Sequence, residues 1–302
     1  MILFVNYNKK TNYIMINPLN SPRPKETLPI SNIMEEIVHA PYFKDIGIGL
    51  HRKTYRIGES RFCLKVPHPN QFAPIVLYLM QCEFMMYQIS HIWSFDVVPF
   101  TKVILHNSTE IEQISAVFNK VNKNDHLQYP LLIQNYVQPK TPYQIDLHQA
   151  QKTLIFNWIT GRQDREKENS VVNKEGKVFE IDNELTFSRI EKPQKPHWLL
   201  DIPLINESPL NKTLINGILG LPETISLKLE TLPVGHASHY NPRARQIKSY
   251  KNGTIEQVQN QVIENLKTLK SVIHNLEINN VQITPKTIEE AIENLGNKYY
   301  VS

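Results

Sequence analysis

Three polar residues in one stretch of the chain have the types and the spacing that phosphoryl transfer needs. Asp164 and Asn169 stand five positions apart, and Asp182 follows thirteen positions later. Transfer of a phosphoryl group from ATP needs a carboxylate beside the attacking hydroxyl, and oxygen ligands that hold Mg²⁺ against the phosphates. We predict that Asp164 orients the acceptor hydroxyl and that Asn169 and Asp182 bind Mg²⁺. A solvated Asp-Arg pair in a loop would explain Asp164, but it would not explain the spacing to the other two residues.

A helix and a hairpin are expected to bring these groups together. Asp146 can cap a helix whose apolar residues recur every four positions. Residues 173–176, Asn-Lys-Glu-Gly, form a turn sequence that would close a short hairpin. That hairpin would hold Asn169 at one end and Asp182 at the other, so both would reach the same edge of a small sheet.

A lysine and a glutamate upstream are candidates for a phosphate-binding ion pair. Lys65 lies in a strand-like segment, and Glu83 is the single acidic residue between Gln71 and Ser94 in an apolar helical run. A carboxylate in so apolar a helix usually needs a partner. We predict that Lys65 pairs with Glu83 and contacts the α- and β-phosphates of ATP. The alternatives are an exposed strand lysine and an exposed helix glutamate.

The stretch from Gly161 to Phe187 resembles the atypical kinases of the phosphatidylinositol 3/4-kinase-like clan. Its pattern, G-x-x-D-R-x-x-x-N followed by I-D-N-x-L-x-F, is most similar to type II phosphatidylinositol 4-kinases and their bacterial relatives. The actin-fragmin kinase-like group carries a related form. The His-Arg-Asp and Asp-Phe-Gly motifs of conventional protein kinases are absent from the sequence. Glu184 stands where the family often has glycine.

The resemblance implies ATP and Mg²⁺ as cofactors and adds residues to the expected site. Gly47 and Gly49 precede the lysine strand, where backbone N–H groups of a glycine-rich loop would cover the phosphates. An ordinary turn is the alternative for these two glycines. Backbone groups from Asn135 to Val137 are expected to form the hinge that contacts the adenine.

The order of expected elements indicates an α+β protein with a bilobal, protein-kinase-like fold. Residues 1–40 would be an N-terminal extension, 41–137 a small, mainly β N-lobe with one helix, and 138–302 a larger, mainly helical C-lobe. The expected strands cover a pair within 55–66 and residues 97–105, 114–121 and 131–137. The expected helices cover residues 72–92, a segment that starts near 146, 210–219, 255–276 and 285–296.

Composition is ordinary for a globular protein. Of the 302 residues, 41% are hydrophobic and 21% are charged, with a net charge of +4. That charge is too small to indicate nucleic acid as a partner. No apolar run reaches the roughly 18 residues that a membrane span needs, and the N-terminus does not resemble a cleavable signal peptide. Cys63 and Cys82 fit a reducing compartment as buried thiols. We therefore expect a cytoplasmic protein, or alternatively one secreted into the cytosol of a host cell.

The acceptor of the phosphoryl group is left open by the sequence. The segment 188–198 follows the expected metal aspartate and carries Arg189, Lys192 and Lys195, with Trp198 at its end. These residues would suit a phosphoinositide headgroup and a transient membrane contact, but a solvated basic loop is equally ordinary. A phosphoinositide and a protein acceptor remain alternatives. A pseudokinase or a nucleotide-dependent binding module is the alternative of a different class.

Overall fold

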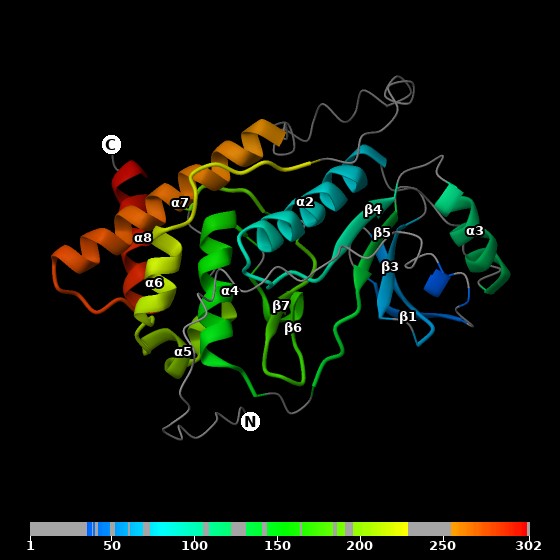
Figure 1. Ribbon diagram of the computed structural model, residues 1–302, viewed down its shortest axis with the longest axis horizontal. Helices are drawn as coiled ribbons and strands as arrows, with labels where there is room; N and C mark the ends of the chain where they lie inside the picture. Colours follow the sequence, from blue (N-terminus) through cyan, green and yellow to red (C-terminus); the bar gives the residue numbers. More distant parts are fainter. Residues whose placement is uncertain are drawn as a thin grey trace.

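An antiparallel sheet of five strands and a group of helices make up the structure, a computed structural model (Figure 1). Asp164 and Gly49 lie outside the residues that it describes, as do Glu184 and most of the expected N-terminal extension. The described residues are 35–37, 39, 42–48, 52–59, 61–68, 73–104, 109–121, 131–140, 144–163, 165–183, 186–190, 196–228 and 255–300.

The sheet contains the strand that carries Lys65. Its order is β1-β2-β3-β5-β4, and all neighbouring strands are antiparallel. Side chains of a strand alternate between the two faces, so Leu64 and Lys65 point to opposite sides. In register, Lys65 lies opposite Thr54 and Leu132. The strands are β1 (Phe43–Ile48), β2 (Arg52–Ile57), β3 (Phe62–Pro67), β4 (Thr101–Ile104) and β5 (Leu131–Asn135).

Each face of the sheet is covered by a helix. On the face of Leu64, α3 (Thr109–Val121) inserts Phe118, whose ring meets Phe43 and Tyr55 edge to face at centroid distances of 5.3 and 5.1 Å. On the face of Lys65, α2 (Ala73–Ile92) packs Met80 against Val103 and Leu132. These contacts explain why the helix with Glu83 lies directly beside the lysine strand.

The prediction of a strand at 114–121 is wrong, because this segment belongs to α3. Ile114 and Phe118 are four positions apart, and both are fully buried on the sheet. That spacing is the helical period, whereas a strand would bury every second residue. Of the residues between them, Ala116 is exposed, whereas Ser115 and Val117 are partly buried.

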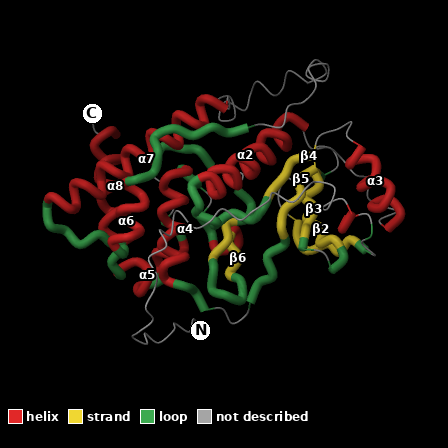
Figure 2. Tube along the Cα trace, in the orientation of Figure 1, coloured by secondary structure: helices red, strands yellow, loops and turns green. Residues whose placement is uncertain are grey.

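The second core lies among the remaining helices, which gather at the other end of the molecule (Figure 2). Helix α4 (Leu147–Thr160) is at its centre and is capped by the Asp146 carboxylate, which accepts from the Gln149 N–H at 2.8 Å, as predicted. Helix α2 also contributes residues to this core, so it contacts both ends of the molecule. The surrounding helices are α5 (Pro203–Glu207), α6 (Lys212–Leu219), α7 (Ile255–Ile278) and α8 (Pro285–Tyr300).

Helix α8 continues past Gly296, where the sequence predicted its end. The other predicted helices are present within a few residues of their expected bounds. A mixture of helices and an antiparallel sheet is therefore confirmed. Within the described residues, no helix combines the length and the apolar character that crossing a bilayer requires. Cys63 and Cys82 are both buried free thiols, as predicted.

A small hairpin lies between the sheet and the helices (Figure 1). Strand β6 (Ser170–Val172) pairs with β7 (Val178–Glu180), and the turn of residues 173–176 joins them as predicted. A 3₁₀ helix, η1 (Lys167–Asn169), leads into β6. The backbone N–H of Glu180 donates to the carbonyl of Val97 at 2.8 Å, which ties the hairpin to the segment after α2.

Candidate active site

The predicted pairing of Lys65 with Glu83 is confirmed. Lys65 Nζ lies 2.8 Å from Glu83 Oε2, and the two side chains are 7% and 0% exposed. The amide of Gln134, on β5, also reaches Glu83 Oε2 at 3.4 Å and donates to the Thr101 hydroxyl at 3.0 Å. A buried carboxylate is costly unless charges and hydrogen bonds compensate it, and these two partners provide that compensation.

Arg52 is a member of this cluster that sequence reasoning missed. Its Nη2 lies 2.5 Å from Glu83 Oε1 and 2.8 Å from Asp182 Oδ1, so one guanidinium joins the two carboxylates. A signal for it existed in the strand pattern. Thr54 lies opposite Lys65, and Arg52 is two positions before Thr54 on the same strand. Alternation therefore places Arg52 and Lys65 on one face of the sheet.

Asp182 faces this pair from the end of the hairpin. Its Oδ1 is 3.8 Å from Lys65 Nζ, and its side chain remains 42% exposed, so a solvent-borne ion can reach it. Burial opposes ionisation of this carboxyl, but Lys65, Arg52 and Arg162 together hold its pKa below the ordinary value. Its backbone has a φ of 57°, a left-handed conformation that is uncommon for a residue with a side chain.

Asn169 is brought next to Asp182 by a backbone hydrogen bond. The N–H of Ile181 donates to the carbonyl of Asn169 at 2.9 Å, so Asn169 lies opposite the residue that precedes Asp182. An amide oxygen and a carboxylate are the hard oxygen donors that Mg²⁺ prefers. This donor set fits the ion, and Arg52 occupies one oxygen of the Asp182 carboxylate, Oδ1. In the described residues, no cluster of three or more His, Cys, Asp or Glu side chains is placed to bind a metal.

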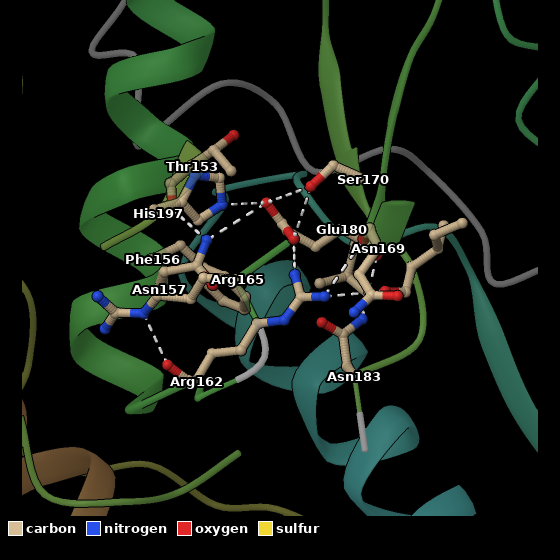
Figure 3. A network of polar contacts seen from close by, with 12 residues as sticks. Thr153, Phe156, Asn157, Arg162, Arg165, Asn169, Ser170, Glu180, Asn183 and His197 are labelled. Atoms are coloured by element: carbon tan, nitrogen blue, oxygen red, sulfur yellow. Dashed lines mark hydrogen bonds and ion pairs between the residues drawn. The ribbon is translucent and has the colours of Figure 1, made fainter. Parts of the chain in front are cut away.

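A buried ionic network around Arg162 and Glu180 contacts the backbone of Asn169 (Figure 3). Arg162 and Glu180 form an ion pair, and both side chains are fully buried. The same guanidinium donates through Nη2 to the carbonyls of Asn169 and Ile181, at 3.2 and 3.0 Å. Arg162 therefore ties together the backbones that carry Asn169 and Asp182.

Further donors complete the satisfaction of the Glu180 carboxylate. Asn157 of α4 donates to its Oε1 at 3.3 Å, and the Ser170 hydroxyl reaches its Oε2 at 3.3 Å. His197 Nε2 lies 3.1 Å from Oε1, while His197 Nδ1 accepts from the Leu199 N–H at 3.1 Å. Since Nδ1 accepts, the neutral ring carries its proton on Nε2 and donates it to Glu180.

The protonation state of His197 follows from its surroundings. The ring is fully buried, and this burial, together with the positive charges of Arg162 and Arg165, lowers its pKa well below 6.5. Because His197 is neutral, it adds no charge to the network, and the Arg162 cation is balanced by the Glu180 anion. A signal for this network was available too, because Val178 and Glu180 share a face of β7, and Val178 is apolar and buried.

Of the remaining predicted residues, the structure describes Gly47, Asn135 and Val137. Gly47 lies near the end of β1, where the pairing with β2 shifts register between Asp45 and Gly47. Asn135 ends β5, and Val137 follows in the segment expected to be the hinge. Asp164 lies outside the described residues, but its neighbour Arg165 is anchored by a hydrogen bond from its Nε to the Arg162 carbonyl at 2.7 Å.

Comparison with known proteins adds no relative to this geometry. No protein-family model matches the chain, and no curated protein sequence matches it. The interpretation of the site therefore depends on the residues and on how they are arranged.

Proposed function

We propose that the protein is an ATP- and Mg²⁺-dependent kinase that phosphorylates a hydroxyl group of a phosphoinositide or a protein. The observation that carries this proposal is that Lys65, Glu83 and Asp182, which are widely spaced in the sequence, lie together, with Asn169 joined through its backbone to the residue before Asp182. An ion-paired lysine that faces an Asp/Asn pair is the arrangement that phosphoryl transfer from ATP uses. The bilobal, kinase-like organisation is part of the same proposal, with the sheet and α2 as the small lobe.

Each residue has a distinct role in this reaction. Lys65, held by Glu83, pairs with the α- and β-phosphates, and Gly47 and Gly49 cover them with backbone N–H groups. Backbone groups near Asn135 and Val137 bind the adenine. These roles require the nucleotide to lie between the sheet and the hairpin.

The transfer step itself uses the carboxylate of Asp164. This carboxylate accepts the proton of the acceptor hydroxyl while the hydroxyl oxygen forms a bond to the γ-phosphorus. The bond between the γ-phosphorus and the β–γ bridging oxygen breaks, and ADP leaves. Bound Mg²⁺ would neutralise the phosphate charge, and Asn169 and Asp182 are the groups that would hold it.

Incubation of the purified chain with γ-labelled ATP and Mg²⁺ tests the proposal. Parallel reactions contain phosphoinositide vesicles and a cell lysate, so label in lipid or in protein identifies the acceptor class. Asp164→Asn should lower transfer by about two orders of magnitude or more with nearly unchanged nucleotide affinity. Asp182→Asn should weaken both. Asp201→Asn, an exposed aspartate of the 3₁₀ helix η2 (Trp198–Asp201), is the matched control. Wild-type rates in both site variants would refute the proposal.

A nucleotide-dependent binding module, or pseudokinase, is the second candidate, and the contact between Arg52 and Asp182 favours it. This guanidinium already pairs, at 2.8 Å from Oδ1, with the carboxylate that would bind Mg²⁺. Thermal-shift titration with ATP, with and without Mg²⁺, separates the two candidates. ATP binding with no transfer to lipid, protein or small molecule would select the binding module. Absence of any response to millimolar Mg-ATP by the folded protein would argue against both.

A further inference from the structure

A large cavity lies apart from the cluster of Lys65 and Asp182. Its volume is about 980 Å³, at the upper end of the range usual for small-molecule sites. It is bounded by the C-terminal half of α2, the segment before β4, the segment after β5 and the β6–β7 hairpin. Figure 1 shows the end of α2 next to this hairpin. No residue of β1, β2 or β3 lines it, and neither do Asn169 and Asp182, but Asn135 and Val137, the proposed adenine-binding residues, form part of its wall.

We propose that this cavity binds a small aromatic acid, meaning a planar ring system that carries one anionic group. The inference goes beyond the proposed kinase activity, with which it shares only the segment of Asn135 and Val137. Two observations carry it. They are the aromatic character of the walls and an excess of positive charge that the cavity's own acidic residues do not balance.

The walls offer aromatic surface from four segments. Tyr87 of α2 and Phe100 meet edge to face with their ring centroids 5.3 Å apart. Tyr136 lines the cavity from the segment after β5, and Phe179 lines it from β7. Aromatic side chains favour a flat ring as a ligand, because they can stack on its face or meet its edge.

The charge comes mainly from the hairpin and from Lys140. Lys177 is half-buried, its Nζ lies 4.9 Å from the centre of the Phe179 ring, and burial lowers its pKa. Asp96 and Glu175 act on Lys177 electrostatically, but within the part of the chain that the structure describes neither forms an ion pair with it. Glu175 is 3.5 Å from Lys174, so those two charges offset each other.

Asp96 cannot by itself neutralise the lysines near the cavity, because it acts on more than one of them. It acts electrostatically on Lys177 and also on Lys152, whose Nζ is buried 3.2 Å from the Ser94 carbonyl. Burial of Lys152 lowers its pKa to about 8. Glu175 acts on Lys177 as well. The lining therefore holds two carboxylates, Asp96 and Glu175, against three lysines, because the exposed Lys140 adds to Lys174 and Lys177. An anionic group on the ligand would balance this excess, while its ring would occupy the aromatic walls.

Three probes separate the two parts of the proposal. 2-Naphthoate has both a ring system and an anion, 2-naphthylmethanol has the ring system alone, and cyclohexanecarboxylate has the anion alone. We expect saturable binding of 2-naphthoate to the full chain, with a dissociation constant of about 1 mM or tighter by ligand-observed NMR. The other two probes should bind about fivefold more weakly or worse.

Variants place the binding in this cavity. Lys177→Gln should weaken 2-naphthoate about fivefold or more, whereas Lys212→Gln, on α6 and outside the cavity, should leave it unchanged. Should Lys177→Gln fail to fold, Lys140→Gln at the exposed rim is expected to weaken binding in the same direction. Equal binding of the uncharged probe, no saturable binding, no effect of either cavity variant, or full displacement by Mg-ATP would each overturn the proposal.

Discussion

Replacement of Glu180 by glutamine should destabilise the folded protein strongly. This change keeps the size of the side chain but removes the negative charge that faces Arg162 inside the protein. Both partners are fully buried, so no water can solvate the guanidinium that is left behind. In addition, an amide nitrogen would replace one of the two oxygens that accept from His197, Asn157 and Ser170.

The magnitude follows from this burial. Removal of one partner from a buried ion pair typically costs about 3–5 kcal/mol, because an uncompensated charge remains inside. A surface ion pair contributes only about 0–1 kcal/mol. For a chain of 302 residues, the loss expected for the buried pair corresponds to a fall in melting temperature on the order of 10 °C. The loss should extend to the site, since Arg162 also holds the carbonyls of Asn169 and Ile181.

Urea unfolding of the wild type and of Glu180→Gln, followed by circular dichroism, measures the difference in their free energies of unfolding. Glu223→Gln is the matched control, because Glu223 forms a surface ion pair with Lys270 at 3.2 Å and its side chain is 47% exposed. The control should lose less than about 1 kcal/mol. A double variant, Arg162→Met with Glu180→Leu, should recover part of the loss, since it leaves neither charge unpaired. If Glu180→Gln were as stable as Glu223→Gln, the assignment of this network as the main polar support of the site would be wrong.

Two further predictions concern the same region. Because the pKa of His197 lies well below 6.5 in the folded protein, the unfolded chain binds a proton that the fold excludes. Its contribution is therefore complete above pH 6.5 and is lost at up to about 1.4 kcal/mol per pH unit below it. Urea midpoints between pH 7 and 5 should fall less steeply for His197→Asn. Gly161, the left-handed C-cap of α4, has no room for a side chain, since a Cβ would lie 1.8 Å from the Ser188 carbonyl oxygen. Gly161→Ala should cost about 3 kcal/mol or more, while Gly47→Ala, with nothing within 4 Å of its Cβ, should change the urea midpoint little.

Local physical rules were sufficient for much of the fold. The hairpin turn at 173–176, the Asp146 cap and the pairing of Lys65 with Glu83 each followed from one residue type in one environment. The ion pair was predictable because a single carboxylate in an apolar helix has few ways to be satisfied. Each of these three predictions required only the local sequence around one residue and the identity of one interacting group.

The errors came from features that the whole fold decides. Residues 114–121 have a pattern compatible with strand or helix, and the packing of Phe118 on the outer face of the sheet selects the helix. Gly296 does not end α8, although glycine is a common helix terminator. Short segments with mixed periodicity cannot be assigned without knowledge of the surface on which they pack.

The arginines of the site were missed for a related reason, and they bear on how the site would work. Arg52, Lys65 and Arg162 meet the carboxylates of Glu83, Asp182 and Glu180, so this cluster is balanced without any ligand. Under the proposed function, Mg-ATP brings Mg²⁺, which would bind Asp182, and phosphates, which would accept from the Arg52 guanidinium once it leaves Asp182. If Arg52 then moved from Asp182 to a phosphate, every buried charge would stay paired before and after binding. A site whose carboxylate had no partner before binding would leave that charge uncompensated in the free protein. The contact that favours a binding module is thus also the contact that nucleotide binding would have to exchange.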